Sequence, residues 1–570
     1  MPLQGGAVAS YFLTSAHSSS SELCLIAVER PGNSLVTFLC LDSNITQIFA
    51  YHFHYSFVCC LVTLHALAFL VSIFPCVDFI AAMIKDGSHC QMILKTEPRH
   101  SQEQNLLSSG KRLRQRLVFH LLPSFIQSKL RPASDIPYRI HPTSYLDGLR
   151  GVASFIVFMG HYTEENLGWW TEPYGLYEDG APSSPLQLPF LRVIYSARPM
   201  VHIFFIISGY VLALKPLKQI HSHQYAALSS TLSSSVFRRG IRLFIPSFVT
   251  LLIMALTVYY GIADYRYASP FMTLYHQLSH WQTTCWELLW ASWAISDISY
   301  PTPVYNPALW TIPVEFSQSL LLFIAILGLS RCVTNARLLI VAGVMAFCFY
   351  SGELYSLEFM GGMFIAEVTI LQDRSLLSPS LSPADLPKFS SDDAPIRCAK
   401  ASTIRQKLVQ IFWIGNVVCG LFIASWTNSH VSEVWGLRVL NAHTPEPYEG
   451  QRIWFCLGAF QIVSACTQVQ LLQDFFTNPI AQYLGRISYA LYLTHNLCLT
   501  VLEPRVVPIL DSVFSNRSFW GRHLTWIAGL ALYLPAIICV ADLFWRAVDR
   551  PTVEFARWLE GKCIVSPKKS

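Results

Sequence analysis

The sequence predicts an all-α polytopic membrane protein, a bundle of about ten transmembrane helices with one candidate extra span near the N-terminus. Its 570 residues are 52% hydrophobic and only 13% charged, whereas soluble domains carry about 25% charged residues. The mean hydropathy is +0.39. Long apolar runs alternate with basic or polar connections along most of the chain. This composition excludes disordered, collagenous and nucleic-acid-binding proteins.

Apolar runs of the length needed for spanning helices recur after residue 140. A helix that crosses a bilayer needs roughly 20 mostly apolar residues. The ranges that meet this expectation are 146–163, 199–215, 241–261, 309–330, 336–351, 353–371, 406–426, 451–470, 480–502 and 523–545. One further candidate span lies within residues 53–84.

Three regions follow from these spans. Residues 1–140 are expected to form an N-terminal extension with the extra span and a basic cytosolic stretch. Residues 141–560 are expected to form the membrane domain. Within it, the polar and Ser/Pro-rich range 372–405 is predicted to be a flexible cytosolic loop.

Basic residues set the expected orientation. Lys and Arg concentrate in alternate connections, including 85–140 and 215–242, and such connections face the cytosol. Sequons at Asn44 and Asn516 would then lie on the opposite side, as expected for a glycoprotein. We therefore expect an integral multi-pass protein of an endomembrane resembling the endoplasmic reticulum.

Two ionisable residues of the first span lie on one helix face. Arg150 and His161 are eleven positions apart, which is three turns plus about 20°. Their separation along the axis is roughly 16 Å. Ionisable groups inside a membrane are costly and usually functional. An arginine reaching the headgroups and a histidine at the opposite interface remains an equally weighted alternative.

Later spans add further polar candidates. Glu315 and His495 are predicted to lie at a depth similar to that of His161, which indicates a common site. An imidazole can act as a general base when a carboxylate orients it. Ser208 is more simply explained by close helix packing. The arginines that precede the third span could clamp a phosphate or merely anchor the cytosolic side; they are Arg238, Arg239 and Arg242.

No metal site is predicted from the cysteines. The 16 cysteines are scattered, many lie in apolar runs, and no Cys-x-x-Cys pair occurs among them. They are expected to behave as small hydrophobic residues.

Five blocks of sequence resemble one known family. In chain order they read DGLRGVASFIVFMGH, FFIISGY, RRGIRLFIPSF, LWTIPVEF and LGRISYALYLTH. Together they are similar to the membrane acyltransferase-3 family over about residues 144–550. Arg150 and His161 match its Arg-x10-His signature, and Glu315 matches its Trp-x4-Glu position. Asp549, followed by Arg-Pro, resembles a further recurrent block.

The resemblance implies about ten helices and the transfer of acyl groups to hydroxyls. It implies that His161 is catalytic with Arg150 as its partner, that Glu315 assists, and that the three arginines bind the donor. Acyl-CoA, with acetyl-CoA expected, would be the co-substrate, and no metal would be needed. Acceptor contacts are expected from Ser208, Tyr210, Trp310 and His495.

The expected function is an O-acyltransferase that acylates a small, hydrophobic, hydroxylated natural product. Its expected partners are membrane lipid, the acceptor and acyl-CoA, without nucleic acid. A glycan or lipid acceptor is the first alternative. A non-catalytic transporter is the second, although no second copy of the Arg-x10-His span supports the internal repeat common in transporters. A catalytically inactive scaffold is a third.

Overall fold

The computed structural model describes residues 119, 122–130, 140–166, 168–176, 183–263, 270–293, 302–377, 394–448, 450–514 and 518–564. The predicted span within 53–84 and the sequon asparagines Asn44 and Asn516 lie outside these residues. So does most of the basic stretch 85–140.

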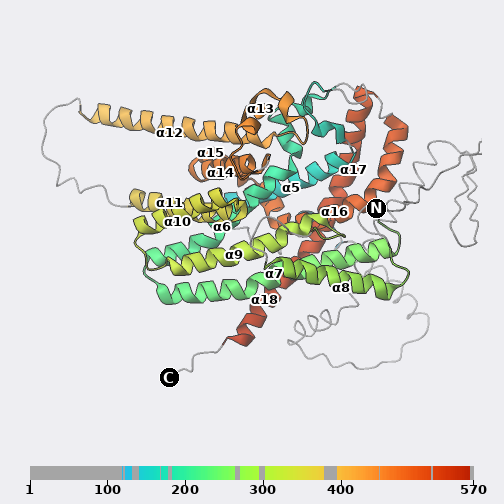
Figure 1. Cartoon of the computed structure of the whole chain (residues 1–570), viewed down its shortest axis with the longest axis horizontal. Helices are drawn as coiled ribbons and strands as arrows, with labels where there is room; N and C mark the ends of the chain where they lie inside the picture. Colours follow the sequence, from blue (N-terminus) through green and yellow to red (C-terminus); the bar gives the residue numbers. More distant parts are fainter. Residues whose placement is uncertain are drawn as a thin grey trace, which may run out of the picture. The chain divides into compact units, whose positions relative to one another are not determined.

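Every regular element in the described ranges is a helix, which confirms the all-α class (Figure 1). The first half contains α4 (Ser124–Leu130), α5 (Ser144–Asn166), η2 (Gly168–Thr171), η3 (Pro185–Gln187), η4 (Leu191–Tyr195), α6 (Ala197–His221), α7 (Tyr225–Tyr259), α8 (Leu274–Ala291), η5 (Pro307–Trp310) and α9 (Thr311–Gly328). The second half contains α10 (Thr334–Ser351), α11 (Leu354–Leu377), α12 (Ala394–Ala424), η7 (Val431–Glu433), α13 (Trp435–Ala442), α14 (Arg452–Gln468), α15 (Gln470–Phe476), α16 (Pro479–Phe514), α17 (Phe519–Phe544), the π-helical turn η8 (Trp545–Asp549) and α18 (Arg550–Cys563).

Seven described helices are long and apolar enough to cross a membrane. They comprise α6, α7, η5 with α9, α10, α11, the second part of α12, and α17 through α18. The pair α14 and α15, bent by 98°, raises the number to eight if it is a single span. Length and composition therefore do not confirm the expected count of about ten.

The two predicted spans that fail this criterion are α5 and α16. Both carry charged and polar side chains, and α16 is buried almost continuously from Ile487 to Val501. A helix that other helices enclose does not need an apolar surface toward lipid. Hydropathy therefore underestimates the two helices that carry the candidate histidines.

Three connections differ from the sequence prediction. The basic connection 215–242 is mostly helix, because α6 continues to His221 and α7 already begins at Tyr225. The connection 262–305 contains the 18-residue helix α8. Helices α11 and α12 extend into the predicted loop 372–405, of which 378–393 lie outside the described residues.

Tryptophans of α8 and the residues after it lie on the protein surface. Trp286, Trp290 and Trp293 are 65%, 70% and 72% exposed, respectively. Tryptophan is enriched where a membrane meets water. This placement agrees with a membrane protein whose α8 packs against α7 and α9.

Helices α5 and α16 pack so closely that their backbones touch. A Cβ atom on Gly151 would lie 2.2 Å from the backbone nitrogen of Gly485, and one on Gly485 would lie 2.4 Å from the carbonyl oxygen of Asp147. Nearby, the hydroxyl of Ser154 donates a hydrogen bond to the carbonyl of Ser488 at 2.8 Å. Small residues at such a crossing allow dense packing without a water-driven hydrophobic effect.

A charged cluster joins α6, α10 and α11, which run side by side (Figure 1). Arg337 donates to Glu367 at 2.5 Å, and the His221 ring contacts the same carboxylate oxygen at 2.8 Å. Arg337 and Glu367 are only 1% and 2% exposed. Removing one partner from such a pair would leave an uncompensated buried charge, so the cluster ties these helices together.

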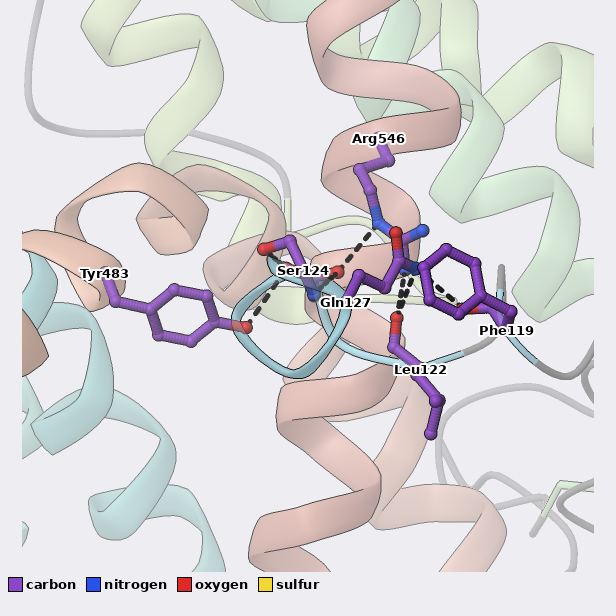
Figure 2. A network of polar contacts seen from close by, with 7 residues as sticks. Phe119, Leu122, Ser124, Gln127, Tyr483 and Arg546 are labelled. Carbon is purple, nitrogen blue, oxygen red and sulfur yellow. Dashed lines mark hydrogen bonds and ion pairs between the residues drawn. The ribbon is translucent and has the colours of Figure 1, made fainter. Parts of the chain in front are cut away.

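The end of the N-terminal extension is attached to the membrane domain through Asp542 of α17. The Ser124 backbone N–H and hydroxyl donate to this carboxylate at 2.9 and 2.5 Å. Tyr483 and Arg546 donate to it as well, at 3.0 and 2.8 Å. Figure 2 shows Ser124 and Gln127 lying between Tyr483 and Arg546. Four donors thus satisfy a carboxylate that is fully buried.

Replacing Gly151 with alanine should destabilise the bundle, because the added Cβ has no room beside Gly485. We expect a loss of about 1–3 kcal/mol, as in other overpacked cores, measured as a lower Tm in detergent. Gly415→Ala on α12 is the control, since nothing lies within 4 Å of its Cβ position. Equal stability of the two variants would contradict the tight crossing.

Candidate active site

A cavity of about 310 Å³ opens among α5, α6, α7, α9 and α16. It contains charged groups within an otherwise apolar bundle. The sequence-predicted site residues that line it are Arg150, Ser208, Arg239, Arg242 and Glu315. Arg150 therefore faces a cavity that it shares with two arginines of α7.

Further lining residues were not singled out from the sequence. Asp147 comes from the same helix as Arg150, and Tyr489 and Tyr492 come from α16. All three occur inside the motif blocks that carry the family resemblance. Their position in those blocks was therefore the available signal, although residue type alone did not separate them from core tyrosines.

Glu315 lies against an arginine and not against a histidine. Its carboxylate forms an ion pair with Arg239, whose Nε also donates to Ser319 Oγ at 2.9 Å. Within the described chain no hydrogen bond or ion pair joins Glu315 to His161. The common depth of Glu315 and His161 stays a prediction. Helix α7 extends far beyond its apolar run and brings Arg239 to Glu315.

Asp549, from the turn before α18, contributes a second carboxylate near the arginines. It is buried, and its electrostatic partners are Arg242 and Arg150. Arg150, Arg239 and Arg242 thus belong to one group, drawn from α5 and α7. Carboxylates offset part of their charge, which makes three neighbouring arginines tolerable in a bundle.

His161 and His495 lie beside each other, as their predicted depth indicated. Their rings are stacked with centroids 5.1 Å apart and planes inclined by 27°. Neither histidine lines the cavity. Tyr492 does, and its ring centroid is 5.8 Å from that of His495. Tyr492 thus lines the cavity and lies against His495, which in turn stacks on His161.

One nitrogen of His495 is buried without a partner. Its Nδ1 donates to the Tyr492 carbonyl at 2.7 Å, so the proton is on Nδ1 and Nε2 keeps its lone pair. Nε2 has no hydrogen bond within the described chain, and the residue is 1% exposed. Burying an unsatisfied acceptor costs about 1–3 kcal/mol. Such an atom is a candidate for contact with a substrate donor.

The start of α9 is attached to α16 next to these residues. Tyr492 donates to the carbonyl of Ala308 at 2.6 Å and lies 2.8 Å from the Thr311 hydroxyl. Asn306 donates to the Leu493 carbonyl at 3.1 Å and accepts from Asn496 at 2.8 Å. These bonds hold the inner end of the cavity in place.

The remaining predicted site residues lie elsewhere. Tyr210 is 2% exposed and hydrogen-bonds with Tyr145, away from the cavity lining. Trp310 packs against Phe205 and Tyr355 with centroids 6.5 and 5.8 Å away. Arg238 lines a second cavity. Helix periodicity separates Ser208 from Tyr210, because residues two apart face different sides.

The acyltransferase-3 family model, described as an acyltransferase domain, matches residues 143–370, which run from the start of α5 into α11. The chain is therefore a membrane acyltransferase, with helices suited to crossing a membrane several times.

Three fungal proteins are similar to most of the chain. O-acetyltransferase PaAT-1 of Phomopsis amygdali is 28% identical over 461 residues, 74% of this chain and 84% of the relative. Acyltransferase clz18 of Cochliobolus lunatus is 23% identical over 472 residues, 75% of this chain and 96% of the relative. Acyltransferase R4 of a Phoma species is 26% identical over 455 residues, 72% of this chain and 94% of the relative. The family match over residues 143–370 and these relatives agree with the resemblance that the motifs carry. No solved structure shows a significant match.

Replacing His495 should separate a structural from a functional role of its ring. Asparagine can keep the donation to the Tyr492 carbonyl but lacks the Nε2 position, whereas glutamine reaches that position. We expect His495→Asn to fold normally and to lose about 10- to 100-fold in acyl transfer, the value of one buried hydrogen bond. His495→Gln should retain more activity.

The matched control is His443→Asn, because His443 makes the same kind of bond, to the Val439 carbonyl at 2.8 Å, on an exposed surface. It should leave both the Tm and acyl transfer unchanged. Full activity of His495→Asn would show that Nε2 takes no part.

Proposed function

We propose that this acyltransferase moves an acyl group, most simply acetyl, from acyl-CoA to a hydroxyl of a small hydrophobic natural product. The observation that carries this proposal is the cavity lined by Arg150, Arg239 and Arg242 and by Tyr492, whose ring lies 5.8 Å from that of His495, which stacks on His161. The similarity to a protein named O-acetyltransferase supports acetyl as the transferred group.

The arginines suit a phosphorylated donor. Guanidinium groups bind phosphate oxygens through paired, charge-assisted hydrogen bonds. Arg239 and Arg242 would take the phosphates of CoA, and Arg150 would position the chain that leads to the thioester. The arginine end of the cavity would then face the cytosol, where acyl-CoA is available, in a membrane of the endoplasmic-reticulum type.

The reaction needs one proton acceptor near the thioester. His161 accepts the proton of the acceptor hydroxyl while the hydroxyl oxygen attacks the thioester carbonyl. Collapse of the tetrahedral intermediate breaks the carbon–sulfur bond, and the CoA thiolate takes up a proton as it leaves. The products are an ester and CoA. The acceptor would approach His161 along Tyr492 and His495, because Tyr492 lines the cavity and lies against His495, which stacks on His161.

The acceptor is best matched by an apolar molecule. Besides its charged groups, the cavity is lined by Val201, Phe204, Phe205, Val211 and Leu212. Apolar walls with a few polar groups are typical of pockets for small ligands. A polymeric glycan would need a polar groove, so a small hydrophobic hydroxylated metabolite fits this lining better.

Replacing His161 with alanine should abolish acyl transfer while the protein still inserts and folds. General acid–base catalysis contributes about 10²–10⁴-fold, and loss of the proposed base should remove about this much. The measurement is ester formation from acetyl-CoA by the purified enzyme in detergent, with the Tm as a folding check.

The acceptor for this assay comes from comparing the metabolites of a deletion strain with those of its parent, through a mass difference of one acyl group. Ester formation in detergent, where no compartments exist, also excludes a transporter. Turnover retained by His161→Ala would refute the assigned base.

A further inference from the structure

A second cavity, of about 240 Å³, lies beside the first and is lined by residues of α6, α7, α9 and α18. It shares Leu212, Arg239 and Arg242 with the first cavity. Its remaining cationic lining residues are Arg238 of α7 and Arg557 of α18. A ligand that extends through both cavities would therefore pass Arg239 and Arg242 and end between α7 and α18.

We propose that Arg557 of the C-terminal helix binds a phosphate monoester at the outer end of the donor, namely the 3′-phosphate of CoA. This inference rests on the proposed function, because it names a contact of the same donor. It assigns a binding role to a residue of α18 that lies beyond the Asp549-Arg-Pro block noted in the sequence.

The register of α18 directs Arg557 to this cavity. Val553, Ala556, Arg557 and Glu560 lie on one helix face, since residues three, four and seven positions apart share a side. Val553, Ala556 and Arg557 all line the cavity. Glu560 pairs with Arg238 at 3.2 Å and so fixes α18 against α7, which the helices' packing confirms (Figure 1).

The charged side chains around the second cavity carry a net positive charge that favours an anion. Arg238 is paired with Glu560, and Arg239 is paired with Glu315. Arg242 and Arg557 form no ion pair with a carboxylate in the described part of the chain. Asp549 offsets only part of the charge of Arg242, and Arg557 is exposed beside it. The remaining positive charge suits a doubly charged phosphate better than a neutral or singly charged group.

A CoA analogue that lacks only the 3′-phosphate tests the assignment directly. Binding of CoA and of 3′-dephospho-CoA to the purified full-length protein is measured by calorimetry. The wild type should prefer CoA. Arg557→Gln should weaken CoA binding by about tenfold or more, as expected when one charge-assisted pair is lost, and leave 3′-dephospho-CoA binding within about twofold. The KM for acetyl-CoA should rise with little change in kcat.

The matched control is Arg550→Gln on the same helix. Arg550 pairs with Glu554 on an exposed surface, with side chains 63% and 60% exposed, and it does not line the cavity. This variant should bind both nucleotides as the wild type does.

Two results would overturn the assignment while leaving the proposed function intact: equal weakening of both nucleotides by Arg557→Gln, or no weakening of either. The phosphate of an anionic lipid has the same chemistry, so binding to phosphatidic acid vesicles is measured in parallel. An effect of Arg557→Gln on vesicles alone would also overturn it. If the wild type binds neither nucleotide and does not turn over acetyl-CoA, the proposed function fails together with it.

Discussion

The close contact between α5 and α16 is the constraint on which the candidate site depends. Because Gly151 and Gly485 have no side chains, the two backbones meet there, and the residues that follow on each helix are forced together. His161 of α5 thereby stacks on His495 of α16, and Arg150 shares a cavity with Tyr492. Larger residues at the crossing would separate the two histidines.

Buried charge is the second organising constraint, and the bundle treats it in two ways. Arg337 and His221 share Glu367, and His202 contacts Glu358; none of these five residues lines the cavity. These paired groups hold helices together. Around the two cavities, cations outnumber the carboxylates that pair with them. The positive charge around these two cavities is only partly neutralised by carboxylates. An anionic substrate could neutralise the remainder there.

The candidate site could be predicted from the sequence only in part. The Arg-x10-His spacing puts Arg150 and His161 on one face, and matching depth in two spans indicates that His161 meets His495. Glu315 was predicted at the same depth, yet it pairs with Arg239. An apolar run does not reveal that α7 begins at Tyr225, because a helix can continue past the membrane. Two further features depend on neighbours from distant segments of the chain. They are the lack of a hydrogen-bond partner for His495 Nε2 within the described chain, and the lining of the second cavity by residues of α18.

The sequence by itself determined the all-α class, the apolar parts of most long helices, and the resemblance to the acyltransferase-3 family, because apolar runs and motif blocks are local properties. It missed α8 and the polar extensions of α7, α12 and α16. It did not determine which polar side chains meet. Tertiary packing decided that Glu315 neutralises an arginine, that Tyr210 points into the core, and that Arg557 reaches the arginines of α7. The physical reason is that a charge in an apolar bundle takes the nearest partner in space, and that distance depends on helix crossings and ends far apart in the chain.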